Sequence, residues 1–160
     1  MSGGATSELP PLGQYFSQLG YVVRQADEVR NLFTTLGVTD FKTFQGGGDT
    51  YQILTGESRT APTIEVSFGT LGSIEIEIIQ PLSSGNLYTD FLEQHGPGLH
   101  HTGYNIPDPA EYRAQYQRLL DLGGRPMNGR RIESERFNVE FCYFDCSHFQ
   151  GSVIELTHFF

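Results

Sequence analysis

Two glutamates of the sequence occupy positions where a charged side chain is costly. Glu77 lies between two isoleucines in a stretch with the alternation of a β-strand, and Glu155 lies between an isoleucine and a leucine in a later stretch. A carboxylate buried in a central strand is unfavourable unless it is paired or bound to a cation. A divalent cation shared by both carboxylates would remove that cost.

An internal repeat indicates which side chains could join them. Gln-Leu-Gly-Tyr at 18–21 matches His-Thr-Gly-Tyr at 101–104, 83 residues later, and Glu77 and Glu155 fall in the last strand of each copy. Such agreement of strand, glycine and glutamate positions is typical of a duplicated module. The repeat therefore predicts one metal site between the two copies, with the ligands Gln18, Glu77, His101 and Glu155.

This set of ligands suits a divalent cation. One imidazole nitrogen and several oxygens, with two negative charges, match Zn²⁺, Ni²⁺, Co²⁺, Mn²⁺ or Mg²⁺. Taken singly, each residue has a simpler explanation: Gln18 as a polar residue at a strand edge, His101 as a core histidine, and the acids as a solvated face. The repeat favours the metal site because it selects all four positions together.

The elements around these residues follow a β-α-β-β-β order twice. Alternating or apolar stretches predict strands, and apolar residues spaced three and four apart predict helices. The expected elements are strands 19–23, 41–44, 63–68 and 74–79 around helix 27–36, then strands 101–106, 125–131, 139–144 and 153–156 around helix 110–122. A short amphipathic helix at 88–94 is expected between the two halves.

Composition excludes several classes of function. There are 19 acidic residues against 10 Lys and Arg, which gives a net charge of −9. This charge argues against nucleic-acid binding and against docking on anionic membranes. The two cysteines, Cys142 and Cys146, are too far apart in one strand to form a disulfide, so we expect a cytoplasmic protein. Residues 1–15 carry no apolar signal segment and are expected to form a flexible leader.

The repeated β-α-β-β-β order, with these four candidate ligands, resembles the vicinal oxygen chelate superfamily. That superfamily includes glyoxalase I, methylmalonyl-CoA epimerase, extradiol dioxygenases and antibiotic-resistance proteins. The resemblance covers about residues 16–158 and is strongest, toward the epimerases, in FLEQHGPGLHHTGYNIPD at 91–108, IEIIQPL at 76–82 and GSVIELTH at 151–158. It implies an α+β fold in which tandem βαβββ modules form a cupped mixed sheet around a metal site. It also implies a homodimer, and a single domain at 16–160 with repeats at about 16–82 and 99–158 and a linker helix within 83–98.

The resemblance also implies roles for single residues. The ligand in the family is the second histidine of the HH pair, here His101, and the family's glutamates correspond to Glu77 and Glu155. Epimerases usually carry a histidine where this chain has Gln18, whereas eukaryotic-type glyoxalase I carries a glutamine there. Glu155 is predicted to act in proton transfer as well. Glu65 is predicted to be the second acid, and the alternative is an outward-facing glutamate of its strand.

The implied reaction is proton transfer at a carbon next to a carbonyl, with a metal that stabilises the enediolate. The favoured function is a metal-dependent epimerase or isomerase acting on a carbonyl compound or thioester. The alternatives are a glyoxalase I-type lyase on a thiol adduct, a metal-free small-molecule-binding protein and, with least support, a dioxygenase.

Further side chains were assigned to substrate binding or packing. His148, Arg125 and Arg131 are predicted to contact the substrate, since arginines can clamp a carboxylate or phosphates. The simpler explanation is that the arginines are solvated and balanced by nearby glutamates, and that His148 is a solvated loop histidine. His100 is expected on the opposite face of its strand from His101, because side chains alternate along a strand. Its expected role is to support the ligand or to pack, rather than to take part in catalysis.

Overall fold

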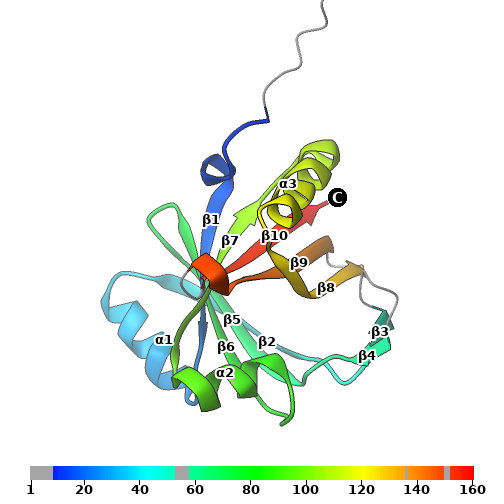
Figure 1. Cartoon of the computed structure of the whole chain (residues 1–160). Helices are drawn as coiled ribbons and strands as arrows, with labels where there is room; N and C mark the ends of the chain where they lie inside the picture. The colour runs from blue at the N-terminus through cyan, green and yellow to red at the C-terminus, as the bar shows by residue number, and fades with distance from the viewer. Residues whose placement is uncertain (1–8, 53–57, 136, 150–151) are drawn as a thin grey trace, which may run out of the picture.

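The computed structural model describes residues 9–52, 58–135, 137–149 and 152–160, and shows one curled sheet of eight strands (Figure 1). The strand order is β2-β5-β6-β1-β7-β10-β9-β8. The strands of this sheet are β1 (Phe16–Val22), β2 (Thr39–Gly46), β5 (Ile64–Leu71), β6 (Ile74–Pro81), β7 (Gly98–Asn105), β8 (Arg125–Glu133), β9 (Asn138–Cys146) and β10 (Ser152–Phe159).

The sheet consists of two equivalent halves. Strands β2, β5, β6 and β1 belong to the first half of the chain, and β7, β10, β9 and β8 belong to the second. In each half the first strand runs parallel to the last, β1 beside β6 and β7 beside β10, and the halves join through the antiparallel pair of β1 and β7. This arrangement confirms the predicted α+β fold with tandem βαβββ modules and a mixed sheet.

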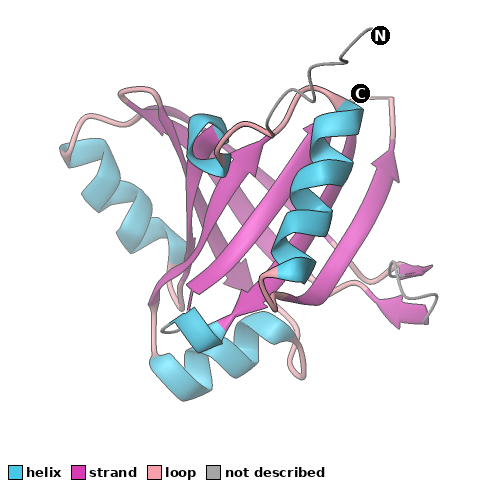
Figure 2. Cartoon of the chain, turned by 45° about the horizontal axis from the view of Figure 1, so that its top comes forward, coloured by secondary structure: helices cyan, strands magenta, loops and turns pink. Residues whose placement is uncertain are grey.

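Two helices cover the outer face of the sheet, one for each half (Figures 1 and 2). Helix α1 (Ala26–Thr35) packs Phe33 against Ile76 and Ile78, and α3 (Pro109–Asp121) packs Leu119 against Leu156. Neighbouring residues of a strand point to opposite faces. Glu77 and Glu155, which alternate with these apolar residues, therefore face the inner side of the curl.

Helix α2 (Leu87–His95) packs against the inner face of the sheet. Its Tyr88 and Leu92 join Val22, Ile79 and Tyr143 in a buried cluster. The side chain of Asn86 caps the helix by accepting hydrogen bonds from the first turn of the backbone, which satisfies donors that the helix leaves unpaired. No helix in the part of the chain described here has the length and apolar character needed to cross a membrane.

A small hairpin, which the sequence analysis did not predict, links the two halves. Strands β3 (Thr50–Gln52) and β4 (Ser58–Thr60) form a separate two-stranded sheet between β2 and β5. Asp49, just before β3, forms an ion pair with Arg130 of β8, and Arg59 of β4 donates a hydrogen bond to the carbonyl of Met127 at 3.2 Å. The sequence of this segment indicated only a glycine-rich break.

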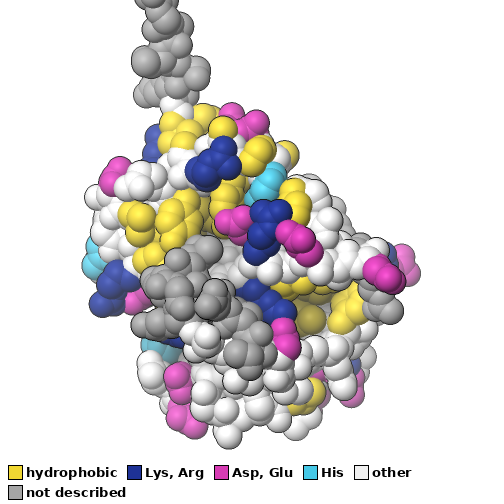
Figure 3. All heavy atoms as spheres, turned by 90° about the vertical axis from the view of Figure 1, so that its right-hand side faces the viewer, with side chains coloured by type: hydrophobic (Ala, Val, Ile, Leu, Met, Phe, Trp, Pro, Cys, Tyr) yellow, Lys and Arg dark blue, Asp and Glu magenta, His cyan; other side chains and the backbone are white. Residues whose placement is uncertain are grey.

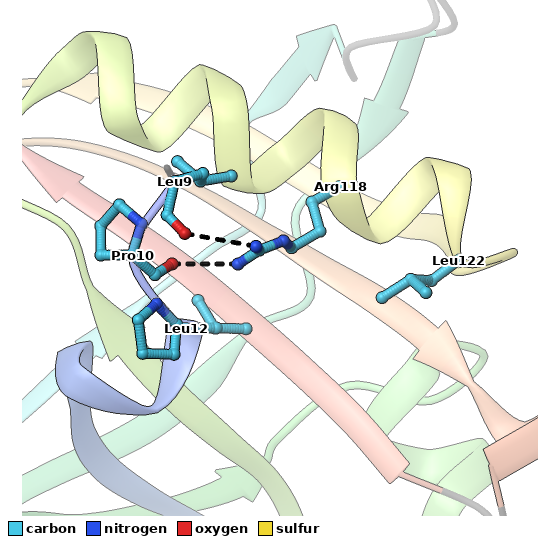
Figure 4. A pocket seen from close by; sticks show the side chains of 6 residues that line it. Leu9, Pro10, Leu12, Arg118 and Leu122 are labelled. Atoms are coloured by element: carbon cyan, nitrogen blue, oxygen red, sulfur yellow. Dashed lines mark hydrogen bonds between the residues drawn. The ribbon is translucent and has the colours of Figure 1, made fainter. Parts of the chain in front are cut away.

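The described structure begins at Leu9, within the stretch that the sequence analysis expected to be a flexible leader. Residues 1–8 lie outside the described residues, but the chain packs against α3 from Leu9 onward (Figure 4). The carbonyl of Pro10 accepts hydrogen bonds from buried Gln115 at 2.7 Å and from Arg118 at 2.9 Å. These contacts correct the expectation of a flexible leader up to residue 15. They were invisible in the sequence because they pair backbone carbonyls with side chains about a hundred residues away.

Candidate metal centre

The centre begins at the crossing of β1 and β7. In their antiparallel register Gln18 lies opposite Gly103, and His101 lies opposite Gly20. A Cβ atom on Gly20 would lie 1.9 Å from the imidazole of His101, and one on Gly103 would lie 2.8 Å from Oε1 of Gln18. Each polar side chain therefore lies over the glycine of the other strand, which explains why the repeat matches in its glycines as well as in its ligands.

The glutamates approach from the two flanking strands. Glu77 of β6 lies beside Gly20, and Glu155 of β10 lies beside Gly103. Nε2 of His101 is 3.1 Å from Oε1 of Gln18, 3.1 Å from Oε2 of Glu77 and 3.4 Å from Oε2 of Glu155. All four side chains are buried. The structure thus brings together the four residues that the repeat selected.

The donor set fits a divalent cation. Ligand atoms of Glu77, His101 and Glu155 lie within 4.8 Å of one another, and Gln18 adds an amide oxygen. Oε2 of Glu77 is buried, and its contact of 3.1 Å with Nε2 of His101 lacks the geometry of a hydrogen bond. A buried acceptor without a partner is unfavourable, and a cation would satisfy it. These residues could therefore hold a metal ion.

Electrostatics couple the imidazole to the carboxylates. Burial alone would lower the pKa of His101, but the carboxylates of Glu155 and Glu77 raise it to about 10. Burial raises the pKa of Glu77, and His101 opposes that shift. The carboxylates thus favour a positive charge on the imidazole, and a metal bound at Nε2 would supply that charge instead of a proton.

A further carboxylate, Glu75, orients Gln18. Glu75 lies two residues before Glu77 and so on the same face of β6, and its Oε1 accepts a hydrogen bond of 2.8 Å from Nε2 of Gln18. This bond directs the other atom of the amide, Oε1, toward His101. Burial raises the pKa of Glu75, while the bond from Gln18 lowers it. Sequence reasoning gave Glu75 no role, although the alternation in β6 places it on the face of Glu77.

His100 lies on the same face as His101, whereas the alternation of the strand predicted the opposite face. The register shifts between Gly20, which is opposite His101, and Tyr21, which is opposite Leu99. His100 is the additional residue of this β-bulge, and a bulge interrupts the alternation of side chains. Its Nδ1 is 3.0 Å from Nδ1 of His101, and burial lowers its pKa to about 3. The alternation of residue types cannot reveal such a shift.

Glu65 lies away from the centre. It is opposite Gln80 in the register of β5 and β6, and residues opposite each other share a face. The side chain of Gln80 accepts a hydrogen bond from the backbone of α1, and Arg30 of α1 donates one of 2.9 Å to Glu65. This corrects the expectation that Glu65 faces the site, because the residues of β5 on Glu77's face are Ile64, Val66, Phe68 and Thr70.

The three residues predicted to bind substrate are not brought to the centre. Arg125 is exposed and pairs with Asp145. The guanidinium of Arg131 lies 3.7 Å above the ring of Phe160 and pairs with Glu133. Nε2 of His148 is 3.0 Å from the carbonyl of Leu122, at the end of α3.

Arg130 faces the inner side of the sheet. It lies opposite Phe141, which packs with the inner cluster, whereas the next residue along the strand is opposite Glu140. Its side chain is 23% exposed and pairs with Asp49. The sequence predicted Arg125 and Arg131 as substrate-binding residues, whereas the register of β8 and β9 places Arg130 on the inner face.

The family model of the Glyoxalase/Bleomycin resistance protein/Dioxygenase superfamily matches residues 17–156, and the chain belongs to this superfamily. A search of curated proteins found no match.

Solved structures share the fold at low sequence identity. Methylmalonyl-CoA epimerase from Mycobacterium tuberculosis matches with a TM-score of 0.63 and 17% identity, covering 98% of this chain and 93% of that one. A variant of the Streptomyces coelicolor epimerase, in complex with 2-nitronate-propionyl-CoA, has a TM-score of 0.62 and 13% identity, with coverages of 90% and 96%. A hypothetical protein from Bacillus halodurans has a TM-score of 0.62 and 15% identity, with coverages of 89% and 92%.

The close crossing at Gly20 leads to a first prediction. We expect Gly20→Ala to weaken Zn²⁺ binding at least about tenfold, because the new methyl group displaces His101 from its oxygen partners. Overpacking should also lower the free energy of unfolding by about 1–3 kcal/mol. Calorimetric titration and urea unfolding measure the two effects. Gly98→Ala, in β7 with open space around it, is the matched control and should change neither; unaltered Zn²⁺ affinity in Gly20→Ala would contradict the geometry.

The placement of Glu65 gives a prediction about pH. The hydrogen bond from Arg30, and then that from Gln45, lower the pKa of Glu65 below its ordinary value of 4.5. The ionised carboxylate therefore stabilises the fold above pH 4.5, and this stabilisation is lost as the pH falls through the lower folded value. We expect Glu65→Gln to cost up to about 1 kcal/mol at pH 7 and less at pH 3, in urea unfolding. Zn²⁺ affinity should not change, and a large loss of affinity would show that Glu65 belongs to the centre.

Proposed function

We propose that the protein is a metal-dependent epimerase or isomerase that moves a proton at a carbon next to a carbonyl. One observation carries this proposal: two buried glutamates from equivalent strands flank Nε2 of His101 from opposite sides of the β1–β7 pair. Removing a proton at one face of a planar intermediate and returning it at the other requires groups on two sides of the substrate.

The chain's own residues have distinct roles in this proposal. Gln18, Glu77, His101 and Glu155 would hold the metal ion, which when bound supplies a Lewis acid for the carbonyl oxygen. Glu155 would take the proton from one face of the carbon next to the carbonyl, and Glu77, on the other side, would return it at the opposite face. Glu75 would keep the amide of Gln18 in place. Because Glu65 faces α1, this proposal gives it no part in the chemistry.

The identity of the metal is part of the proposal. Zn²⁺, Ni²⁺, Co²⁺, Mn²⁺ and Mg²⁺ all accept carboxylate and amide oxygens. The imidazole of His101 favours a transition-metal ion over Mg²⁺, which prefers oxygen ligands.

The proposed substrate is a small carbonyl compound or thioester that also carries an anionic group. Arg130 faces the inner side of the sheet and pairs with Asp49, a carboxylate that an anionic substrate could replace. Figure 3 views the side of the molecule with β8 and the β3–β4 hairpin, and shows hydrophobic side chains in a hollow bordered by basic and acidic ones. An acyl-CoA thioester, of the kind bound in the S. coelicolor structure, combines these chemical features.

A glyoxalase I-type lyase is the second candidate. It is favoured by Gln18, whose Oε1 lies 3.1 Å from Nε2 of His101 in the position where epimerases usually carry a histidine. A lyase of this type also moves a proton next to a carbonyl but acts on the adduct of a thiol and an oxoaldehyde. A metal-free binding protein is the third candidate. The assembly into homodimers and the cytoplasmic location stay predictions.

Proton exchange with solvent tests the function. Protein loaded with Zn²⁺, Co²⁺ or Mn²⁺ is incubated in D₂O with 2-methyl-branched acyl-CoA thioesters, 2-oxo acids or glutathione hemithioacetals, and ¹H NMR follows loss of the proton next to the carbonyl. We expect exchange with one substrate class. Glu155→Gln should slow it by roughly 10²- to 10⁴-fold, since it removes the base while keeping an oxygen ligand.

Two measurements make this experiment decisive. The metal content of each sample shows whether Glu155→Gln still holds the ion, and exposed Glu133→Gln is the control that should exchange at the normal rate. Exchange with an acyl thioester supports the epimerase, and exchange with a hemithioacetal supports the lyase. No exchange with any class, or no uptake of metal, would refute the proposed function.

A further inference from the structure

A ring of aromatic side chains encloses His100 beside the metal centre. Its imidazole lies edge-on to Tyr88 and Phe91 of α2 and to Tyr143 of β9, with ring centroids 5.7, 5.0 and 5.7 Å away. The side chain is 5% exposed. Of its two nitrogens, Nδ1 is directed at a polar partner, Nδ1 of His101, at 3.0 Å.

The direction of this hydrogen bond follows from the other nitrogen of His101. Three oxygens surround Nε2 of His101, at 3.1, 3.1 and 3.4 Å. A metal at that position requires Nε2 without a proton, so the neutral ring must carry its proton on Nδ1. Since one of the two facing nitrogens must donate and the other accept, Nδ1 of His101 donates and Nδ1 of His100 accepts.

We propose that His100 is a positioning residue, which accepts the Nδ1–H of His101 and thereby presents Nε2 of His101 to the metal. This inference deepens the proposed function and rests on it for the presence of the metal. Ligating histidines commonly donate a hydrogen bond from the N–H of their second nitrogen to a carboxylate or a backbone carbonyl. Loss of that partner typically weakens metal binding 10- to 100-fold. Here the acceptor of that hydrogen bond is the adjacent imidazole of His100, which the β-bulge brings to the same side of the strand as His101.

The aromatic ring fixes the acceptor. Tyr88 and Tyr143 also contact each other through their hydroxyls, at 3.3 Å, so α2 and β9 hold His100 from two directions. His100 in this arrangement carries its proton on Nε2. An imidazolium carries a proton on Nδ1 as does a metal-bound imidazole, so Nδ1 of His101 is a donor with either a proton or a metal on Nε2. The imidazole of His101 is therefore oriented before a metal arrives.

Two substitutions of matched shape separate positioning from packing. His100→Asn places an amide oxygen at the same number of bonds from Cα as Nδ1, so it keeps an acceptor. His100→Leu has the same branching and no acceptor. Both remove the imidazole from the aromatic ring to the same extent. In calorimetric titrations with ZnCl₂ we expect the Leu variant to bind roughly 10- to 100-fold more weakly than the unaltered protein, and the Asn variant to recover most of that loss.

The tautomers of the unaltered protein provide a second measurement. Long-range ¹H–¹⁵N spectra of the metal-free and Zn²⁺-loaded protein should show His100 protonated on Nε2 in both, and His101 protonated on Nδ1 in both. This measurement needs no variant, so it decides the inference even if His100→Leu does not fold. A proton on Nδ1 of His100 would overturn it.

The outcomes also separate this inference from the proposed function. If the unaltered protein takes up no Zn²⁺, the proposed function fails, while the spectra of the metal-free protein still test the hydrogen bond. If it binds Zn²⁺ and the Leu variant binds it equally well, the positioning role of His100 is refuted and the metal centre stands. Equal losses in the Leu and Asn variants would show a packing role only.

Discussion

The close antiparallel crossing of β1 and β7 is the constraint on which the rest of the molecule depends. Gly20 and Gly103 leave the space in which His101 and Gln18 lie across the neighbouring strand. Because the two strands are the first strands of equivalent halves, their crossing places both side chains near one point. A side chain at either glycine would displace His101 or Gln18, so the candidate centre and the junction between the halves are the same structure.

The parallel strands on either side extend this arrangement. β6 pairs with β1, and β10 pairs with β7, in equivalent parallel registers. Glu77 and Glu155 therefore reach the crossing from opposite sides. The outer faces of these strands are occupied by apolar contacts with α1 and α3. This division leaves the inner face for polar groups, and the cost of burying two carboxylates is met by the imidazolium of His101 or by a bound cation.

Much of the fold and of the centre could be predicted from the sequence, for an identifiable reason. Because the module is duplicated, the two halves can be compared position by position. Gln18 becomes a candidate because it is equivalent to His101. The alternation of Glu77 with isoleucines also determines which face it occupies once α1 covers the other. The error at Glu65 arose because a turn of variable length separates its strand from β6, and the face of a residue changes with each single-residue shift.

The sequence by itself determined the two modules, the sheet strands, the helices and the four residues of the centre, since these follow from periodicity and repetition along the chain. Only the tertiary structure decided what depends on register and on distant contacts. The bulge moved His100 to the side of His101, the pairing of β8 with β9 selected Arg130 over its neighbour, and α3 ordered the segment from Leu9. The physical reason is that residue type encodes burial, whereas a bulge, a register or a carbonyl's partner is set by neighbours far away in the chain.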